Sequence, residues 1–151
     1  MTALGQEPTL GPRFDERDLM PFDLDERYVQ AAEQALGVSF PTSYRVAMMR
    51  SNGGAIATES DDWDLYPIAD DSDRKRLART LNGVVPETQR ARAWHGFPPS
   101  AVLLGGNGEG DQLVFLAVGK GLGPEIFIWR HEACDLVRVA DDFAALVTGA
   151  T

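Results

Sequence analysis

The chain has 151 residues, of which 44% are hydrophobic, 23 are acidic and 14 are basic, and its formal net charge is −9. This composition is that of a globular domain large enough to bury a core, and it excludes a disordered chain. The negative charge disfavours nucleic acid as a direct partner, because binding phosphates requires a basic surface, and it favours a partner with a basic surface.

Localisation follows from what the sequence lacks. No stretch approaches the roughly 18 uninterrupted apolar residues that a membrane helix needs, so we expect no membrane partner. The first residues have neither the basic start nor the apolar run of a signal peptide. The single cysteine, Cys134, cannot form an internal disulfide and fits a reducing compartment. We therefore predict a cytoplasmic protein.

The first strongly periodic segment is residues 23–37, which predict a helix. Asp23 or Asp25 can cap its N-terminus, and apolar residues recur at steps of three and four. Gly37 then supplies a left-handed stop.

A second helix is predicted directly after the first. Pro41 suits the first helical position, where a missing N–H costs nothing, and the run Asn52, Gly53 and Gly54 ends the helix in a turn. Because the link between the two helices is very short, we expect them to pack together on one side of a sheet.

The middle of the chain predicts one strand and two short basic helices. Residues 63–68 alternate and are rich in β-formers. Residues 72–82 and 86–94 predict surface helices, with Leu77 and Leu81 as anchors that point inward.

The last third predicts an antiparallel meander and a closing helix. The predicted strands are residues 101–105, 112–118, 125–130 and 136–140, and the helix follows a cap at Asp141 or Asp142. Helices first and strands later predict an α+β fold, a single domain over residues 21–151 with an antiparallel β-sheet flanked by helices. Residues 1–20 carry little periodic signal and predict a flexible N-terminal arm.

The glycine-rich stretch LLGGNGEGDQLVF, residues 103–115, was tested as a ligand loop. A P-loop needs Lys after its second glycine, but Asp111 follows Gly110. An EF-hand starting at Asn107 lacks the required Gly and Glu at its sixth and twelfth positions. We therefore interpret the stretch as a hairpin, with Asp111 bonding N–H groups of the turn. Its structural turn residues are Gly106, Asn107, Gly108, Gly110 and Asp111.

No catalytic or metal-binding motif is complete. His131 and Glu132 begin an HExxH-like run, but Asp135 stands where the second histidine is needed. We predict no catalytic residue, no metal and no cofactor. Trp129 ends an alternating strand and is either a core residue or the floor of a groove, which would comprise Trp129, His131 and Glu132.

Charge is distributed unevenly along the chain. Residues 59–73 contain seven acids and no base, and residues 74–92 contain six bases and one acid. The two runs could neutralise each other inside the fold or form two opposite patches, and the sequence leaves both open.

Several short motifs follow one another along the chain in an order that is typical of a known family. They are Leu36-Gly37, Phe40-Pro41-x-x-Tyr44, Asn52-Gly53-Gly54, Trp63-x-Leu65, Gly106-Asn107-Gly108-x-Gly110-Asp111, Ile128-Trp129-x-His131-Glu132 and Val139-Ala140-Asp141-x-Phe143. Together they cover about residues 24–147. This order resembles the SUKH superfamily, in its branch related to the yeast cell-wall-synthesis regulators.

The resemblance implies an α+β fold with an antiparallel sheet flanked by helices, and a protein that binds rather than catalyses. Similar domains in bacteria are mostly immunity proteins, which neutralise a toxin of a polymorphic or contact-dependent system, often a nuclease or deaminase. Two alternatives remain open: a regulatory or scaffolding module that binds a cellular protein, and a small-molecule or enzymatic site near Trp129, His131 and Glu132.

The acidic run is the predicted contact surface for such a partner. An acidic surface can mimic the polyanion that a nuclease binds. Trp63 and Tyr66 would be its aromatic anchors. Its acids are Glu59, Asp61, Asp62, Asp64, Asp70, Asp71 and Asp73.

Overall fold

The computed structural model describes residues 21–59 and 61–148, and the predicted arm lies outside them. The helices of this part are α1 (Glu26–Leu36), α2 (Thr42–Arg50), α3 (Arg74–Arg79), α4 (Val84–Ala91) and α5 (Phe143–Thr148). Its strands are β1 (Gly54–Ala57), β2 (Asp62–Leu65), β3 (Ala101–Gly106), β4 (Gln112–Val118), β5 (Gly121–Leu122), β6 (Ile126–Arg130) and β7 (Asp135–Ala140). The predicted α+β fold is confirmed.

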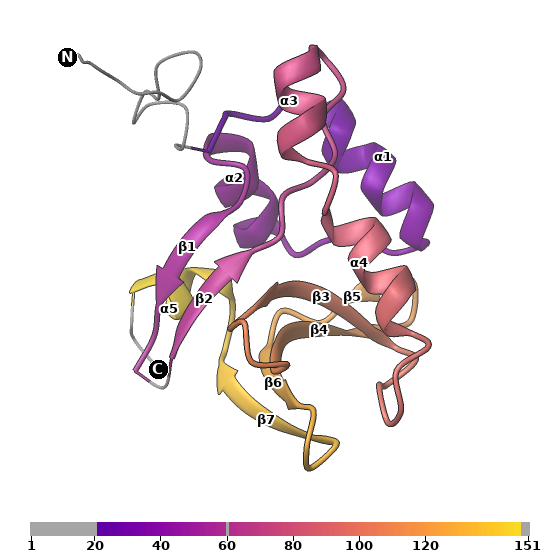
Figure 1. The fold of residues 1–151 in the computed structure, drawn as a ribbon, viewed down its shortest axis with the longest axis vertical. Helices are drawn as coiled ribbons and strands as arrows, with labels where there is room; N and C mark the ends of the chain where they lie inside the picture. Colours follow the sequence, from indigo (N-terminus) through magenta and orange to yellow (C-terminus); the bar gives the residue numbers. More distant parts are fainter. Residues whose placement is uncertain (1–20, 60, 149–151) are drawn as a thin grey trace, which may run out of the picture.

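The strands form one antiparallel sheet in the order β1-β2-β3-β4-β6-β7, with β5 paired to β4. The predicted meander is therefore confirmed. Figure 1 shows α1, α2 and α3 gathered at one end of the sheet, while α4 lies close to β3.

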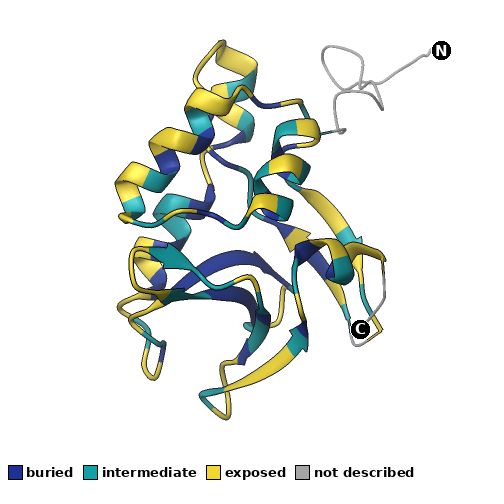
Figure 2. Cartoon of the chain, turned by 180° about the vertical axis from the view of Figure 1, so that it is seen from behind, coloured by how far each residue is buried: buried dark blue, intermediate teal, exposed yellow. Residues whose placement is uncertain are grey.

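The sheet carries an apolar cluster on each of its two faces. On the first face, side chains of the strands pack against α1, α2 and α5. Tyr44 of α2 is buried there and makes edge-to-face contacts with Phe40, Phe115 and Phe143 at centroid distances of 5.2, 5.3 and 5.3 Å. The second face carries a smaller cluster, made of Ala91, Phe97, Ala101, Leu103, Val114 and Trp129. Strand β3 is buried along its whole length, because both of its faces are covered, and Figure 2 shows buried strand segments at the centre of the sheet.

The helix predicted over 23–37 is confirmed in its caps as well as its body. The Asp25 carboxylate accepts a hydrogen bond from the Arg27 N–H at 2.9 Å. Gly37 has a φ of +72° and its N–H donates to the Glu33 carbonyl at 2.8 Å, which ends the helix. Pro41 lies one position earlier than predicted: it is the cap of α2 and has an extended backbone.

The turn at Asn52, Gly53 and Gly54 is confirmed, and Asn52 does more than end a helix. Its buried side chain donates to the Ile68 carbonyl and accepts from the Ile68 N–H, both at 2.8 Å. The amide therefore ties the end of α2 to the chain that follows β2.

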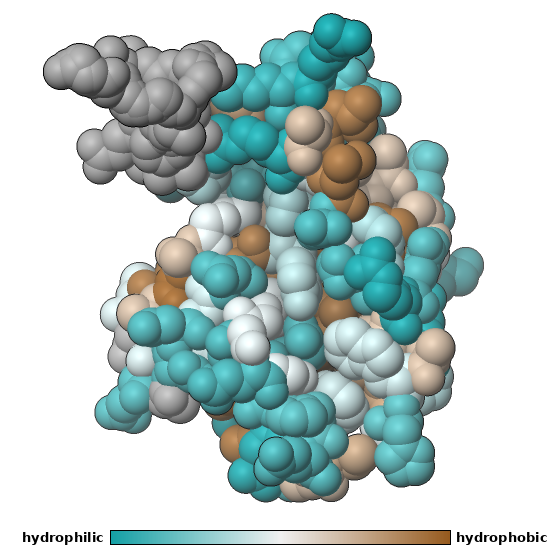
Figure 3. Space-filling model, in the orientation of Figure 1, coloured by the Kyte–Doolittle hydropathy of each residue, from teal (hydrophilic) through white to brown (hydrophobic). Residues whose placement is uncertain are grey.

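Three local predictions were wrong. Strand β1 was not predicted, because it is short and lacks an alternating pattern. The strand predicted over 63–68 ends at Leu65. Pro67 follows two residues later, and it has no N–H to donate to a strand ladder. Leu77 and Leu81 are exposed rather than anchored inward, and in Figure 3 an apolar patch lies beside α3.

Candidate functional site

Strand β2 separates the acidic run into inner and outer side chains. Asp62 and Asp64 are exposed, and Trp63 and Leu65 are buried in the cluster of the first face. This alternation is the ordinary consequence of a strand with one covered face. Trp63 packs on the first face, and successive side chains of a strand point to opposite faces. The side chain of Asp64, which is paired with Gly106 of β3, therefore projects on the second face of the sheet.

Trp63 does not belong to an exposed contact surface. Its side chain is only 2% exposed, and its indole N–H donates to the Thr58 hydroxyl at 3.1 Å. The predicted anchor is therefore a core residue, because β2 turns it toward the helices of the first face.

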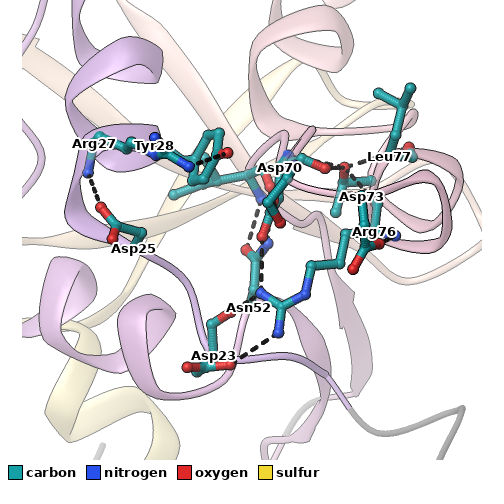
Figure 4. A network of polar contacts seen from close by, with 12 residues as sticks. Asp23, Asp25, Arg27, Tyr28, Asn52, Asp70, Asp73, Arg76 and Leu77 are labelled. Atoms are coloured by element: carbon teal, nitrogen blue, oxygen red, sulfur yellow. Dashed lines mark hydrogen bonds and ion pairs between the residues drawn. The ribbon is translucent and has the colours of Figure 1, made fainter.

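Asp70 is also internal, at 1% exposure. Its carboxylate accepts hydrogen bonds from the Ser72 N–H and hydroxyl at 2.9 and 2.6 Å, and from the Arg76 guanidinium at 3.1 Å. Arg76 also reaches the Asp23 carboxylate at 3.1 Å, which places it between two acids (Figure 4). Through the pair of Asp70 and Arg76, one acid of the acidic run is neutralised by a base of the basic run.

The pKa of Asp70 is lowered by these contacts. Burial alone would raise it, but the hydrogen bonds from Ser72 and the Arg76 guanidinium outweigh burial and favour the ionised form. A carboxyl with a depressed pKa in the folded state stabilises the protein above its unfolded pKa, about 3.9, and loses that contribution as the pH falls through the folded value.

We therefore expect Asp70→Asn to lower the free energy of unfolding by about 1–3 kcal/mol at neutral pH. The difference from the unaltered protein should shrink below about pH 4, since protonation of Asp70 then removes from the unaltered protein a contribution that the variant lacks at every pH. Urea unfolding at pH values from neutral to below about 4 measures this difference in the free energy of unfolding. Asp71→Asn, at the exposed neighbouring residue, is the matched control. A pH-independent difference would contradict the assignment.

The other acids of the run have several local roles. Asp61 is half-buried and accepts from the Asn107 amide at 2.7 Å, and Asp73 caps α3 by accepting from the Arg76 N–H at 2.8 Å. Glu59 and Asp71 are exposed. The acids of the run that are exposed to solvent are thus Glu59, Asp62, Asp64, Asp71 and Asp73.

A groove of about 500 Å³ opens on the second face, between α4 and the hairpin of β3 and β4. Its size is typical of pockets that take a ligand or a side chain. It is lined by Tyr66, Glu87, Trp94, His95, Gly110, Gln112, Trp129 and His131.

Aromatic rings form one wall of the groove. Trp94 and Trp129 stack with their centroids 5.9 Å apart and an interplanar angle of 22°, and Phe97 packs edge-on against both. The indole N–H of Trp129 donates to the Gly96 carbonyl at 3.3 Å. Trp129 is buried and Trp94 is half-exposed, so Trp94 offers the accessible ring.

Polar side chains also line the groove. The Tyr66 hydroxyl donates to the Gln112 amide oxygen at 2.8 Å. The pKa of Tyr66 is raised, first by burial and then by the nearby negative charge of Glu87, and Asp64 adds to the effect. The charges of Glu87 and Asp64 therefore reach the groove.

The predicted groove residues are only partly brought together. Trp129 and His131 line this groove, whereas Glu132 lines an adjoining cavity of about 350 Å³, together with Glu109, Asp111 and Arg130. Sequence reasoning missed Glu87, His95 and Gln112 as groove residues. They lie far apart in the chain, and no local spacing marks them.

The hairpin over 103–115 is confirmed, but the role predicted for Asp111 was wrong. It is Asn107 that accepts from a turn N–H, that of Glu109, at 2.8 Å. Asp111 instead accepts from the His131 N–H at 3.1 Å, and its carboxylate lies 2.9 Å from His131 Nδ1. Asp111 therefore ties the hairpin to the turn that follows β6.

Two properties of the described residues bear on the chemistry. Within residues 21–59 and 61–148, no group of three or more His, Cys, Asp and Glu side chains is placed to hold a metal ion. In the same part of the chain, no helix has the length and apolar character to cross a membrane.

The family model described as SMI1 / KNR4 family (SUKH-1) matches residues 23–149. The search of curated proteins found no match. The resemblance stated from the ordered motifs is confirmed.

Proposed function

The chain belongs to the SMI1 / KNR4 family (SUKH-1), and on that premise we propose that it is an immunity protein that neutralises a bacterial toxin by direct binding. The match over residues 23–149 is the observation that carries the proposal, because the family is generally one of non-enzymatic immunity and regulatory domains. The protein would act in the cytoplasm, without catalysis of its own.

The second face of the sheet is the proposed contact surface. The side chain of Asp64 projects on this face, and that of Asp62, two residues earlier on the same strand, projects the same way. Glu59 lines a pocket with Trp63 of the first face, and Asp71 and Asp73 lie where the chain enters α3, so the proposed surface depends on Asp62 and Asp64. An acidic surface of this kind steers a basic partner into contact and competes with the polyanion that a nuclease binds.

Co-expression tests the proposal. The gene next to the one encoding this chain would be expressed in a bacterial host, alone and together with this protein, and growth would be followed. We expect arrest by the neighbour alone, growth when both are present, and a complex of the two in size-exclusion chromatography. Continued arrest in the presence of folded protein, or a harmless neighbour, would count against immunity.

The unaltered protein must be compared with a variant that is folded but changed at the surface. Asp71→Lys is suitable as a first control and should keep protection, because Asp71 is exposed, lies outside strand β2 and receives no hydrogen bond on its side chain among the described residues. A stable complex with a cellular protein, in place of a toxin, would instead support a regulatory or scaffolding role.

A further inference from the structure

We infer that the groove on the second face binds a guanidinium group, and that its occupant is an arginine side chain of the protein partner. That the arginine belongs to a protein partner rests on the proposed function, whereas binding of a guanidinium group by the groove does not depend on it. The inference depends on three features of the groove: an accessible aromatic ring, a negative charge and the near absence of competing cations.

The aromatic feature is Trp94. Its ring is held in place by the stack on Trp129 and by the edge of Phe97, so it loses little freedom when a ligand binds. Tryptophan is the best aromatic partner for a cation placed over its face, and a planar guanidinium can also stack on it. Tyr66 supplies a second, half-exposed ring among the residues that line the groove.

The negative charge comes chiefly from Glu87. Its side chain is only 13% exposed, so water screens its carboxylate less than it screens a fully exposed acid. Burial is the main cause of the raised pKa of Tyr66, and the charges of Glu87 and Asp64 add to it while that of Arg90 opposes them. Of the described residues that line the groove, none is Lys or Arg.

The chain itself shows that Glu87 accepts a guanidinium group. Arg90, one helical turn later and 59% exposed in its side chain, places Nη1 2.7 Å from Glu87 Oε2. Because the Arg90 side chain is mostly exposed, an incoming arginine can displace it from Glu87 or share the carboxylate. Arg90 is therefore an internal competitor for the site.

The acidic residues of β2 extend this electrostatic arrangement. Asp64 projects on the same face as the groove, so a basic segment of the partner would meet Asp62 and Asp64 beside the site that takes its arginine. A buried aromatic pocket with a charged contact is the usual form of a binding hot spot.

The test uses a probe that requires no partner. N-acetyl-arginine amide is titrated into the full-length protein, and the indole N–H signals of the three tryptophans are followed by NMR. We expect the signals of Trp94 and Trp129 to shift and saturate in the millimolar range, while that of Trp63 on the opposite face stays in place. The citrulline analogue, equal in shape but uncharged, should shift them much less.

Matched variants assign the effect to named groups. We expect Glu87→Gln and Trp94→Leu each to weaken binding of the arginine amide about fivefold or more. Arg90→Gln should strengthen it, because the internal competitor is removed. Asp71→Asn, with the same change of charge as Glu87→Gln but on another segment, should leave it unchanged. A spectrum that keeps the dispersion of the unaltered protein excludes unfolding as the cause.

The outcomes separate this inference from the proposed function. Equal shifts with arginine and citrulline amides, or full binding by Glu87→Gln, would overturn the groove as a guanidinium site whether or not the protein neutralises a toxin. Full protection by Glu87→Gln in the co-expression assay would show that the groove is not the site that contacts the partner. Failure of protection by the unaltered protein, with the arginine amide still bound, would instead reject immunity and leave the guanidinium site standing.

Discussion

Replacing Trp63 with alanine is expected to lower the free energy of unfolding by about 3–5 kcal/mol, which is a large part of the stability of a typical domain. The indole is 2% exposed and packs in the larger apolar cluster, so its removal leaves a cavity and takes away its hydrogen bond to the Thr58 hydroxyl. Urea unfolding followed by circular dichroism measures the loss.

The neighbouring residue provides the control. Asp62 is exposed on the same strand, and Asp62→Ala should change stability by no more than about 0.5 kcal/mol. If Trp63→Ala were as stable as Asp62→Ala but failed to bind a partner, Trp63 would be a contact residue after all.

Reversing the charges of Asp62 and Asp64 together is expected to abolish protection in the co-expression assay. Two like-charge contacts in place of two attractive ones cost several kcal/mol, which corresponds to about 100-fold weaker binding. Asp62→Lys/Asp64→Lys should fold normally, because both side chains point to solvent. Binding is measured by calorimetry with the partner at two salt concentrations.

A second double variant distinguishes a local contact from a general effect of net charge. Glu132→Lys/Asp141→Lys makes the same change in charge at the ends of β7, which is the opposite edge of the sheet from the β1–β2 pair. It should retain protection. Equal loss in both double variants would show that long-range attraction, and not the second face, governs binding.

Local signals explain what the sequence predicted correctly. The helix over 23–37 was predicted with its ends because Asp25 and Gly37 act within one turn of their own positions. The hairpin over 103–115 was predicted because a glycine-rich turn between two apolar runs leaves few other conformations. For both elements, the cause lies within a few residues in the chain.

The predictions that failed depend on contacts between distant segments. An acidic run is typical of a solvated surface, yet Asp70 is buried because Arg76 and Ser72 satisfy it. Alternation shows that Trp63 and Asp64 point to opposite sides, but only the packed helices decide which side is covered. No sequence pattern predicts the groove. Its lining residues Tyr66, Trp94 and Trp129 lie far apart in the chain, and the strand order of the sheet brings them to one site.

The two-sided sheet has a consequence for how such a domain can change over time. The larger cluster on the first face holds the helices to the strands, whereas the proposed binding surface lies on the second face. Substitutions at Glu87, Trp94 or Asp64 can therefore accumulate without the loss of stability that a change at Tyr44 or Phe115 would bring. A single scaffold of this kind can drift toward new partners while its folding remains under constant selection.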